Sequence, residues 1–271
     1  MIRLAIISAN ELRHKYLRRY LNSIKDFSVE ICLVEKNNTR QYHEVLKSKY
    51  FNHNEKKHFL IRTQVEKSFF FHKITKLKEV KNLIFLNKRE LNTNPKVMKY
   101  LKSKKIDLVV CFGCSIIKDP ILNFYKKKFI NIHLGLSPYY RGSATNFWPG
   151  VNNEPQFFGA TFMQLDKGVD TAPILHQFRP LMTINDNIHT IGNKIIMEAI
   201  SMLPNIIKKF KKIKAVKIDK IKEERVYKKK NYNEKALKSL EKNFKSDMIK
   251  KYLKNKKKID KKYPIIISNC I

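Results

Sequence analysis

Short apolar runs alternate with longer polar segments over the first half of the chain. The apolar runs cover residues 2–8, 27–34, 82–87, 106–113 and 129–133. Runs of this length that are apolar at successive positions are typical of strands buried on both faces of a parallel sheet. Their alternation with helical segments predicts an α/β fold, in which helices cover both faces of a Rossmann-like, mostly parallel, doubly wound sheet.

Helical spacing is clearest directly after the first apolar run. Asn10 can cap a helix, because its side chain accepts a hydrogen bond from an amide of the first turn. Leu12, Tyr16, Tyr20 and Ile24 follow at helical spacing. We therefore expect a helix that begins immediately after Asn10.

The other elements follow from composition and periodicity. Residues 40–80 are polar, aromatic and basic, and we expect a helix and a loop there. Helices are also expected over 95–104, where Pro95 suits a first turn, and over 186–209. Two further strands are expected in FFGATFMQL and APILHQF, which the tight connection DKGVDT joins.

Composition changes after residue 207. From Lys208 to Lys262 there are 24 Lys or Arg against 7 Asp or Glu, a net +17 and half of the chain's +34. One helical face stays apolar there, formed by Leu237, Leu240, Phe244, Met248 and Tyr252. We predict a main α/β domain over 1–207 and a basic, mainly helical C-terminal extension over 208–271 that docks through this face.

Size and charge narrow the class of protein only in part. The 271 residues are 43% apolar, which is enough for a sizeable core and argues against disorder. The excess of 57 Lys and Arg over 23 acidic residues favours a polyanionic partner, such as nucleic acid, anionic lipid or a phosphorylated substrate. The lysines are also scattered among many Asn and Ile, which is what a general bias in composition would produce. The charge can therefore reflect either a polyanionic partner or such a bias.

Cysteine usage and hydropathy point to the cytoplasm. The four cysteines follow no disulfide framework, and Cys111 and Cys114 have no second pair with which to complete a zinc site. The N-terminal apolar run is too short for a signal peptide, and no run approaches the ~20 residues of a membrane span. We expect a cytoplasmic protein with no membrane partner.

The segment NIHLGLSPYYRGSATNFWPG, residues 131–150, carries the clearest chemistry. Asn131 and His133 share one face of the expected strand, at the carboxyl end where ligands bind in open parallel sheets. An amide can donate to a carbonyl oxygen that gains negative charge, and an imidazole can move protons near neutral pH. This pair suits acyl transfer.

Other chemistries find less support in the same region. Asp166 and Asp170 lie in the DKGVDT connection and can reach the same edge, where one of them can orient the histidine. Ser137 precedes a proline and lacks the G-x-S-x-G context of a nucleophile. No ligand spacing is diagnostic of a metal site, and the first turn, SANELRHK, lacks the glycine fingerprints of dinucleotide and nucleoside triphosphate sites.

Two blocks of sequence resemble the folate-dependent formyltransferases. The blocks are NIHLGLSPYYRG, residues 131–142, and GATFMQLDKGVDT, residues 159–171. Their order and spacing match the family pattern of Asn-x-His, a Ser-Pro loop ending in Arg-Gly, and a Gly-Ala-Thr strand leading to Asp-x-Gly-x-Asp. The resemblance is convincing over about residues 80–185. That family includes enzymes that act on methionyl-tRNA, on glycinamide ribonucleotide and on nucleotide sugars.

The resemblance implies a reaction and a catalytic set. It implies transfer of a formyl group from 10-formyltetrahydrofolate to an amine, without a metal, and makes 1–207 the catalytic domain. By position, Asn131 would polarise the formyl oxygen, His133 would shuttle the proton, and Asp170 would orient the imidazole.

The resemblance also implies where the folate binds. The segment CFGCSII aligns with the loop beside the pterin ring, where backbone groups make most contacts. Asp166 would shape the neighbouring loop against the folate. The expected folate-binding residues are Phe112, Gly113, Ser115, Ile116, Asp166 and Gly168.

The acceptor amine is less defined. Departures from the tRNA and ribonucleotide enzymes favour an amino sugar nucleotide or a similar small amine, with or without a phosphate. Arg13, with His14 and Arg18 nearby, can meet a phosphate or simply form a charged helix face. The expected acceptor residues are Asn10, Arg13, Arg141 and Trp148, of which Trp148 can equally be a core residue. Charged tRNA held by the basic extension, and hydrolysis of the formylated folate, are the alternatives; a homo-oligomer is possible.

Overall fold

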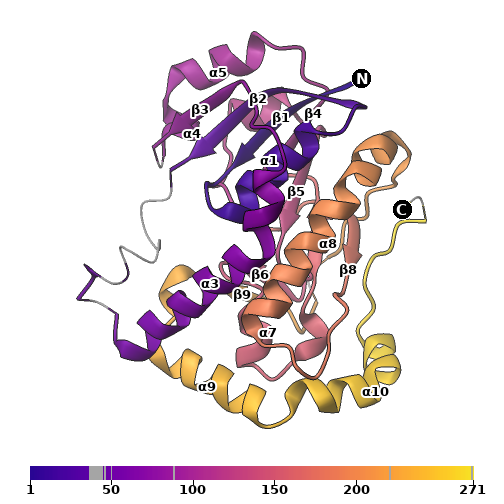
Figure 1. Ribbon diagram of the computed structural model, residues 1–271. Helices are drawn as coiled ribbons and strands as arrows, with labels where there is room; N and C mark the ends of the chain where they lie inside the picture. Colours follow the sequence, from indigo (N-terminus) through magenta and orange to yellow (C-terminus); the bar gives the residue numbers. More distant parts are fainter. Residues whose placement is uncertain (37–44, 46, 50, 88, 220, 270) are drawn as a thin grey trace.

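Seven strands form one sheet in the part of the chain that the computed structural model describes, residues 1–36, 45, 47–49, 51–87, 89–219, 221–269 and 271 (Figure 1). They are β1 (Ile2–Ser8), β2 (Phe27–Glu35), β3 (Leu83–Leu86), β4 (Leu108–Phe112), β5 (Phe129–His133), β7 (Ala160–Met163) and β8 (Ile174–Phe178). Their order is β3-β2-β1-β4-β5-β7-β8. The first five are parallel, and the β5–β7 and β7–β8 pairs are antiparallel. The predicted α/β fold with a mostly parallel, doubly wound sheet is confirmed.

Helices cover both faces of this sheet. The helices that the structure describes are α1 (Leu12–Asn22), α3 (His53–Thr75), α4 (Glu90–Thr93), α5 (Pro95–Lys102), α6 (Ile121–Phe124), α7 (Trp148–Val151), α8 (Ile188–Lys209), α9 (Glu234–Lys245) and α10 (Met248–Lys262), of which α1, α3, α5, α6 and α8 pack on the sheet. Along β1, Leu4 and Ile6 pack into the core that α1, α3 and α8 share, whereas Ala5 and Ile7 pack with α5 and α6. This alternation explains why the strand is apolar at every position from Leu4 to Ile7.

The strand order creates a natural binding edge. From β1 the chain builds outward through β2 and β3, and then returns to the other side of β1 to add β4 and β5. Such a reversal leaves a crevice at the carboxyl ends of the central strands, where ligands bind in this class of fold. The pair Asn131 and His133 lies at that end of β5.

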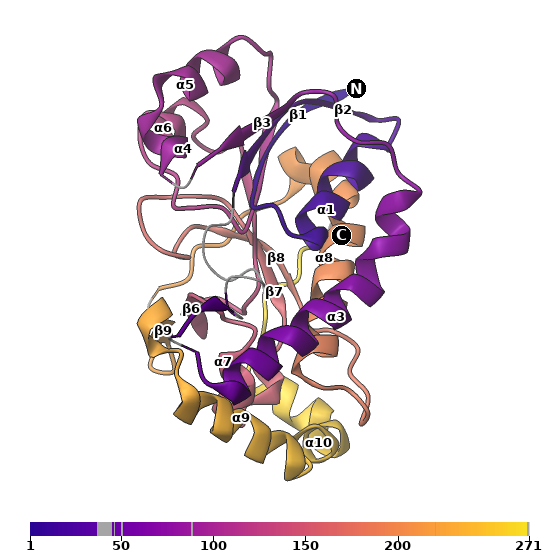
Figure 2. The same cartoon turned by 60° about the vertical axis from the view of Figure 1, so that its left-hand side comes forward.

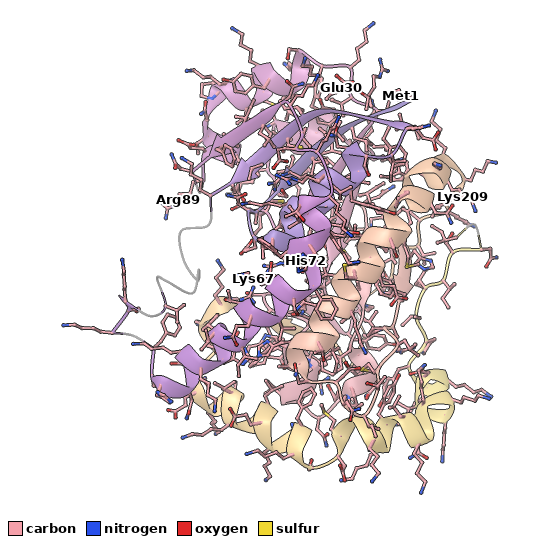
Figure 3. All side chains as sticks on the ribbon, in the orientation of Figure 1. Met1, Glu30, Lys67, His72, Arg89 and Lys209 are labelled. Atoms are coloured by element: carbon pink, nitrogen blue, oxygen red, sulfur yellow. The ribbon has the colours of Figure 1, made fainter. Side chains whose placement is uncertain are left out.

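The C-terminal extension runs under the body of the molecule. Helices α9 and α10 lie along the lower edge, beneath α7 and the amino end of α3 (Figures 1 and 2). Leu237 and Leu240 of α9 pack with Trp148, while Met248 and Tyr252 of α10 pack into the main core. Long side chains project outward from both helices (Figure 3). The division at residue 207 stays a prediction.

A second, small sheet ties the extension to the domain. In it β6 (Tyr140–Gly142) pairs in parallel with β9 (Arg225–Tyr227). Three short 3-10 turns, at Pro155–Phe157, Phe210–Lys212 and Lys229–Asn231, complete the described elements. The β6–β9 pairing was not expected from the sequence, because three-residue strands carry no periodicity to detect.

Two expectations about helix boundaries are wrong. Helix α1 is capped by Glu11 and not by Asn10, because His14 provides the reciprocal contact to the Glu11 backbone. The apolar face expected to run through the tail is divided between two helices, since Asp247 between them has a left-handed backbone (φ 60°). Phe244 is only half-buried as a result. Part of the expected 40–80 element, residues 40–44, 46 and 50, lies outside the described residues.

No helix among the described residues is long and apolar enough to cross a membrane.

Candidate active site

A cavity of about 410 Å³ opens at the carboxyl ends of β1, β4 and β5, and helices α3 and α8 close it from the other side. Its volume is that of a small-molecule site. Apolar groups of Phe112, Ile132 and Leu134 form part of the wall. The polar residues that line it are Glu11, Arg13, His14, His58, Arg62, Glu66, Asn131, His133, Thr145, Asn146, Asp170, His189, Asn193 and Tyr232.

The three residues expected to carry catalysis meet in this cavity. Asn131 and His133 come from β5, at positions that point to the same side, and Asp170 comes from the loop after β7. The His133 Nδ1 atom lies 3.2 Å from Oδ1 of Asp170, and their side chains are only 7% and 14% exposed. The structure therefore brings together two loops that are separated by more than thirty residues of sequence.

His133 is held at both ring nitrogens. Its Nε2 atom lies 2.9 Å from the carbonyl oxygen of Tyr140, and its Nδ1 atom faces the Asp170 carboxylate. Both neighbours are hydrogen-bond acceptors, so the imidazolium, with a proton on each nitrogen, satisfies both contacts at once. The two contacts together fix the orientation of the ring in the cavity.

Asp170 is itself fixed by the backbone. Its Oδ2 atom accepts a hydrogen bond from the Gly142 amide at 2.8 Å. Its own φ is 53°, a left-handed conformation that is uncommon outside glycine, although Asp and Asn adopt it more readily than other residues. Uncommon backbone conformations of this kind persist where surrounding contacts impose them, and they are found often at functional sites.

Asp166 and Gly168 shape the loop that presents Asp170, and neither lines the cavity. Asp166 Oδ1 accepts hydrogen bonds from the Gly168 amide at 2.9 Å and the Thr171 hydroxyl at 2.8 Å. A Cβ atom at Gly168 would lie 2.0 Å from that hydroxyl, so only glycine fits. Neither residue therefore lies where the sequence placed it, in the expected folate site.

The expected folate residues divide into two groups. Phe112 and Gly113 line the cavity, together with Cys114. Ser115 and Ile116 do not: the Ser115 amide donates to Glu35 Oε2 at 2.5 Å, and Ile116 is 57% exposed. The chain turns away from the cavity after Cys114, which the apolar sequence CFGCSII did not reveal.

Position 113 needs a glycine, because His14 of α1 lies directly against it. Its φ is 66°, and a Cβ atom there would lie 2.5 Å from Nε2 of His14. The His14 ring also packs against Phe112, with ring centroids 4.6 Å apart. The start of α1 and the loop after β4 therefore form one rigid wall of the cavity.

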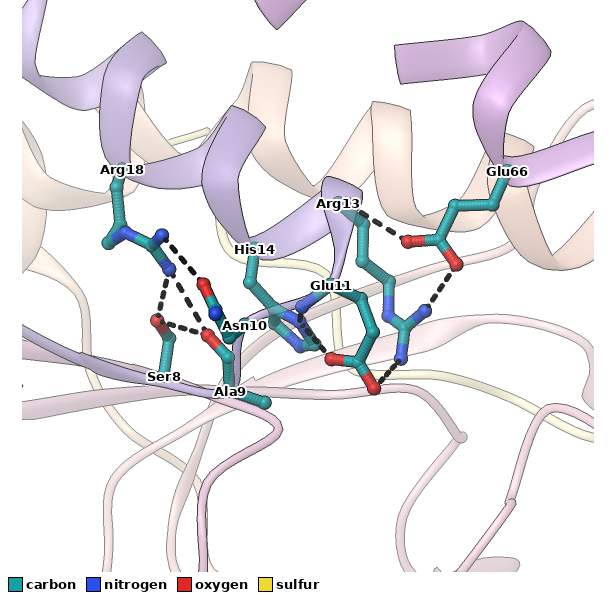
Figure 4. Close-up of polar contacts among 8 residues, drawn as sticks. All are labelled: Ser8, Ala9, Asn10, Glu11, Arg13, His14, Arg18 and Glu66. Atoms are coloured by element: carbon teal, nitrogen blue, oxygen red, sulfur yellow. Dashed lines mark hydrogen bonds and ion pairs between the residues drawn. The ribbon is translucent and has the colours of Figure 1, made fainter. Parts of the chain in front are cut away.

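An ion-pair network occupies the start of α1 (Figure 4). Arg13 Nη1 pairs with Oε2 of Glu66 at 2.7 Å, Arg13 Nη2 lies 3.4 Å from Glu11 Oε1, and His14 Nδ1 lies 2.7 Å from Glu11 Oε2. Although burial opposes ionisation, Arg13 and His14 hold the pKa of Glu11 well below its usual range. Arg13 lines the cavity as expected, but its positive charge is already paired with the Glu66 carboxylate.

The other expected acceptor residues lie outside the cavity. Asn10 receives a hydrogen bond from Arg18, which is buried and also bonds Ser8 and Ala9, so Arg18 cannot meet a ligand (Figure 4). Arg141 pairs with Glu224 and donates to the Val169 carbonyl at 3.0 Å.

Trp148 is a core residue. Its ring stacks on Tyr227 with centroids 4.1 Å apart, and its indole nitrogen donates to the Ser143 carbonyl at 2.9 Å. It is 4% exposed and does not line the cavity. The structure thus favours the core alternative that the sequence left open.

A second group of lining residues was missed from the sequence. His58 and Arg62 of α3 face His189 of α8, and the two imidazole centroids are 4.5 Å apart. Burial, with Arg62 nearby, lowers the pKa of His58 to about 4, and burial with His58 and Arg62 lowers that of His189 to about 3. Helix α3 lies outside the segment that resembles the family, so the sequence offered no reason to choose His58 or Arg62. For His189 the one available signal is Asn187, which caps the amino end of α8 two residues earlier.

Among the described residues, no group of three or more His, Cys, Asp or Glu side chains is arranged to hold a metal ion.

Comparisons with known proteins agree with this fold. The family model described as "Formyl transferase" matches residues 31–207. A methionyl-tRNA formyltransferase of Thermodesulfovibrio yellowstonii is 35% identical over 117 residues, which cover 42% of this chain and 37% of that protein. One from Caldanaerobacter subterraneus subsp. tengcongensis is 28% identical over 159 residues, covering 58% and 51%. The chain thus matches about half, or less, of these relatives' length.

Solved structures extend the likeness in fold. WlaRD, a sugar 3N-formyl transferase, aligns with a TM-score of 0.56 at 19% identity, over 90% of this chain and 79% of that one. Phosphoribosylglycinamide formyltransferase from Anaplasma phagocytophilum aligns with a TM-score of 0.56 at 15% identity, over 83% and 96%. The family model covers most of the chain, and the protein belongs to the formyl transferase family.

Proposed function

We propose that this protein transfers a formyl group from 10-formyltetrahydrofolate to an amine. The observation that carries the proposal is the convergence of Asn131, His133 and Asp170 in one cavity, with His133 Nδ1 3.2 Å from the Asp170 carboxylate. An amide, an imidazole and an orienting carboxylate are the groups that acyl transfer to an amine requires.

The cavity suits a folate. Its wall of Phe112, Leu134 and the Gly113 backbone offers apolar surface beside exposed peptide groups, as a flat heteroaromatic ring requires. Phe112, Gly113 and Cys114 would hold the ring, and 10-formyltetrahydrofolate supplies the formyl group. WlaRD is described in the presence of 5-N-formyl-THF, and a Helicobacter canadensis N-formyltransferase in complex with folinic acid.

Each residue of the catalytic set has a distinct task. The Asn131 amide donates to the carbonyl oxygen as it gains negative charge, an effect worth about 2.7–4 kcal/mol where one such donor has been removed. His133 accepts the proton that the attacking amine loses, and it can return a proton to the folate nitrogen when the bond from that nitrogen to the formyl carbon breaks and tetrahydrofolate leaves. Asp170 then stabilises the imidazolium, whose other proton faces the Tyr140 carbonyl.

The direct test is to incubate the full-length protein with 10-formyltetrahydrofolate and candidate amines, and to follow release of tetrahydrofolate. We expect Asn131→Ala to lower kcat by about 10²–10³-fold, as for loss of one oxyanion donor. Asn123→Ala, an exposed position on α6, is the matched control and should keep full activity. Equal activity of the Asn131 variant and wild type would reject the assigned role. Turnover without any amine would indicate hydrolysis of the folate instead.

We propose a small amine that bears a phosphate as the acceptor, of which an amino sugar nucleotide is an example. The wall opposite the folate residues carries His58, Arg62 and His189, and the described hydrogen bonds include none at either imidazole. These groups suit an oxyanion, because an entering dianion would favour protonation of both rings beside Arg62. WlaRD is described with dTDP and the Helicobacter canadensis protein with dTDP-3-aminofucose.

This acceptor class predicts a difference between two substrates. A phosphate-bearing amino sugar should have a KM at least tenfold below that of the same sugar without phosphate. His189→Gln should remove most of that difference and leave kcat largely unchanged. A His189→Gln protein that keeps the full preference would rule out this wall as the phosphate-binding surface.

A second acceptor, aminoacyl-tRNA, is favoured by the relatives that are methionyl-tRNA formyltransferases and by the basic extension. Phosphate contacts release counterions, so such activity would fall steeply between about 50 and 200 mM salt. Replacing the exposed Lys235, Lys238 and Lys242 of α9 by Glu should then weaken tRNA binding. Unchanged affinity for tRNA in that variant would exclude this use of α9.

A further inference from the structure

The strand β9 brings the C-terminal extension to the catalytic loop. It pairs in parallel with β6, with Tyr140 opposite Arg225 and Gly142 opposite Tyr227. The flanking hydrogen bonds run from the Arg225 amide to the Tyr139 carbonyl at 2.9 Å, and from the Ser143 amide to the Tyr227 carbonyl at 2.8 Å. The position of the β6 backbone therefore depends on a segment more than eighty residues later in the chain.

The β6 backbone in turn holds both members of the His–Asp pair. The carbonyl oxygen of Tyr140 lies 2.9 Å from His133 Nε2, and the Gly142 amide donates to Asp170 Oδ2 at 2.8 Å. A shift of β6 would thus move the Tyr140 carbonyl away from His133 Nε2. It would also move the Gly142 amide, which holds the Asp170 carboxylate next to His133 Nδ1.

The two strands are in unusually close contact at Gly142. Its φ is 94°, and a Cβ atom there would lie 2.2 Å from the Tyr227 carbonyl oxygen. Only glycine permits this backbone conformation and this approach together. The contact falls at the residue whose amide holds Asp170.

Side chains fix β9 in the same place. The Tyr227 hydroxyl accepts a hydrogen bond from Asn152 Nδ2 at 2.7 Å, and its ring stacks on Trp148 at 4.1 Å. Asn152 also donates to the Tyr140 hydroxyl at 2.8 Å, so one amide links the two strands. Arg225 pairs at 2.8 Å with Glu154, the carboxylate that accepts from the Tyr140 hydroxyl.

We propose that β9 is a positioning element of the active site, with Tyr227 as its anchor. The extension thereby sets the orientation of His133 and the place of Asp170, although no residue of β9 lines the cavity. This inference rests on the proposed function for its effect on rate, but the alignment of His133 can be measured without any substrate.

The test compares Tyr227→Ala with Tyr227→Phe, which keeps the stacked ring and loses only the hydroxyl. Tyr100→Ala, which removes a ring of similar exposure on α5 across the sheet, is the matched control. A displacement of about 1 Å can cost about 10²-fold in rate, so we expect kcat of Tyr227→Ala to fall 10–100-fold with KM values within twofold. Tyr227→Phe should recover most of this loss, and Tyr100→Ala should show none.

The second readout is the ring nitrogen NMR spectrum of His133, assigned with a His133→Gln protein. In Tyr227→Ala the chemical shifts of the His133 ring nitrogens should change, while circular dichroism shows a folded protein. A folded Tyr227→Ala protein with the wild-type His133 spectrum would overturn the inference. If no amine is ever formylated, the proposed function fails, and the His133 spectrum still decides the role of β9.

Discussion

At the residue scale, the catalytic set depends on a carboxylate placed by an uncommon backbone. Asp170 adopts a left-handed conformation, accepts from the Gly142 amide and faces His133. Its contribution has two parts, the shape of the loop and the negative charge beside the imidazole. These parts can be separated, since Asn tolerates the same backbone without the charge.

We predict that Asp170→Asn lowers kcat by about 10²–10³-fold while stability stays within about 0.5 kcal/mol of wild type, because charge is lost and the loop is kept. Steady-state kinetics and urea unfolding measure the two quantities. Asp247→Asn is a matched control, since Asp247 is exposed and has the same left-handed backbone far from the cavity (φ 60°). Full activity in Asp170→Asn would show that the charge on this residue is not needed.

Gly113 carries a second prediction at this scale. An alanine there must adopt a φ of 66° and push against Nε2 of His14, so Gly113→Ala should cost about 1–2 kcal/mol of stability or more. Because this loop forms the expected folate wall, the KM for 10-formyltetrahydrofolate should rise more than the KM for the amine. Equal changes in both would argue that Gly113 does not contact the folate.

The sequence predicted these residues unevenly. Asn131, His133 and Asp170 were found because they stand in two blocks of recognisable order. His58 and His189 were missed, since nothing in a sequence relates two single histidines more than a hundred residues apart. Trp148 and Arg141 were placed near the acceptor because they neighbour His133 in sequence, but their partners Tyr227 and Glu224 lie in the extension.

At the scale of elements, the sheet and the helical character of the extension were predictable, but the division of the extension and its pairing with the domain were not. Each central strand is apolar at consecutive positions, which is the pattern of a sheet covered on both sides. The tail has a clear amphipathic pattern, but no periodicity shows that Asp247 divides it into α9 and α10, or that β9 pairs with β6. Such long-range pairings depend on the assembled fold.

The docking of α9 can be tested through Leu240. It is 2% exposed and packs against Gly150 of α7, so Leu240→Ala should cost about 2–5 kcal/mol. Urea unfolding measures the loss, and Lys238→Ala, exposed on the same helix, should change stability by less than about 0.5 kcal/mol. A Leu240→Ala protein as stable as the control would mean that α9 does not hold this position in solution.

At the scale of the whole molecule, stability is expected to depend on pH through one histidine on each of the helices α3 and α8, which close the cavity. His58 and His189 have folded-state pKa values of about 4 and about 3, below the usual value of about 6.5. Between the folded-state pKa values and about pH 6.5, these two imidazoles bind protons in the unfolded chain but not in the folded protein. The free energy of unfolding therefore has its full value above about pH 6.5 and decreases as the pH falls toward 3–4.

We therefore expect His189→Gln to lose less stability than wild type when the pH is lowered from 7 to 4.5. Urea midpoints at a series of pH values would show this as a shallower slope for the variant. His72→Gln, an exposed histidine farther along α3, should keep the wild-type slope. Parallel slopes for His189→Gln and wild type would show that this imidazole titrates normally in the folded protein.

The central claim is that the His133 site transfers a formyl group. The most direct measurement is the mass of an amine acceptor after incubation with 10-formyltetrahydrofolate and either wild type or Asp170→Asn protein. We predict that wild type converts the amine to a product heavier by one formyl group, with one tetrahydrofolate released per product, and that the variant is slower by about 10²–10³-fold. The same product formed at equal rates by both proteins would contradict the account.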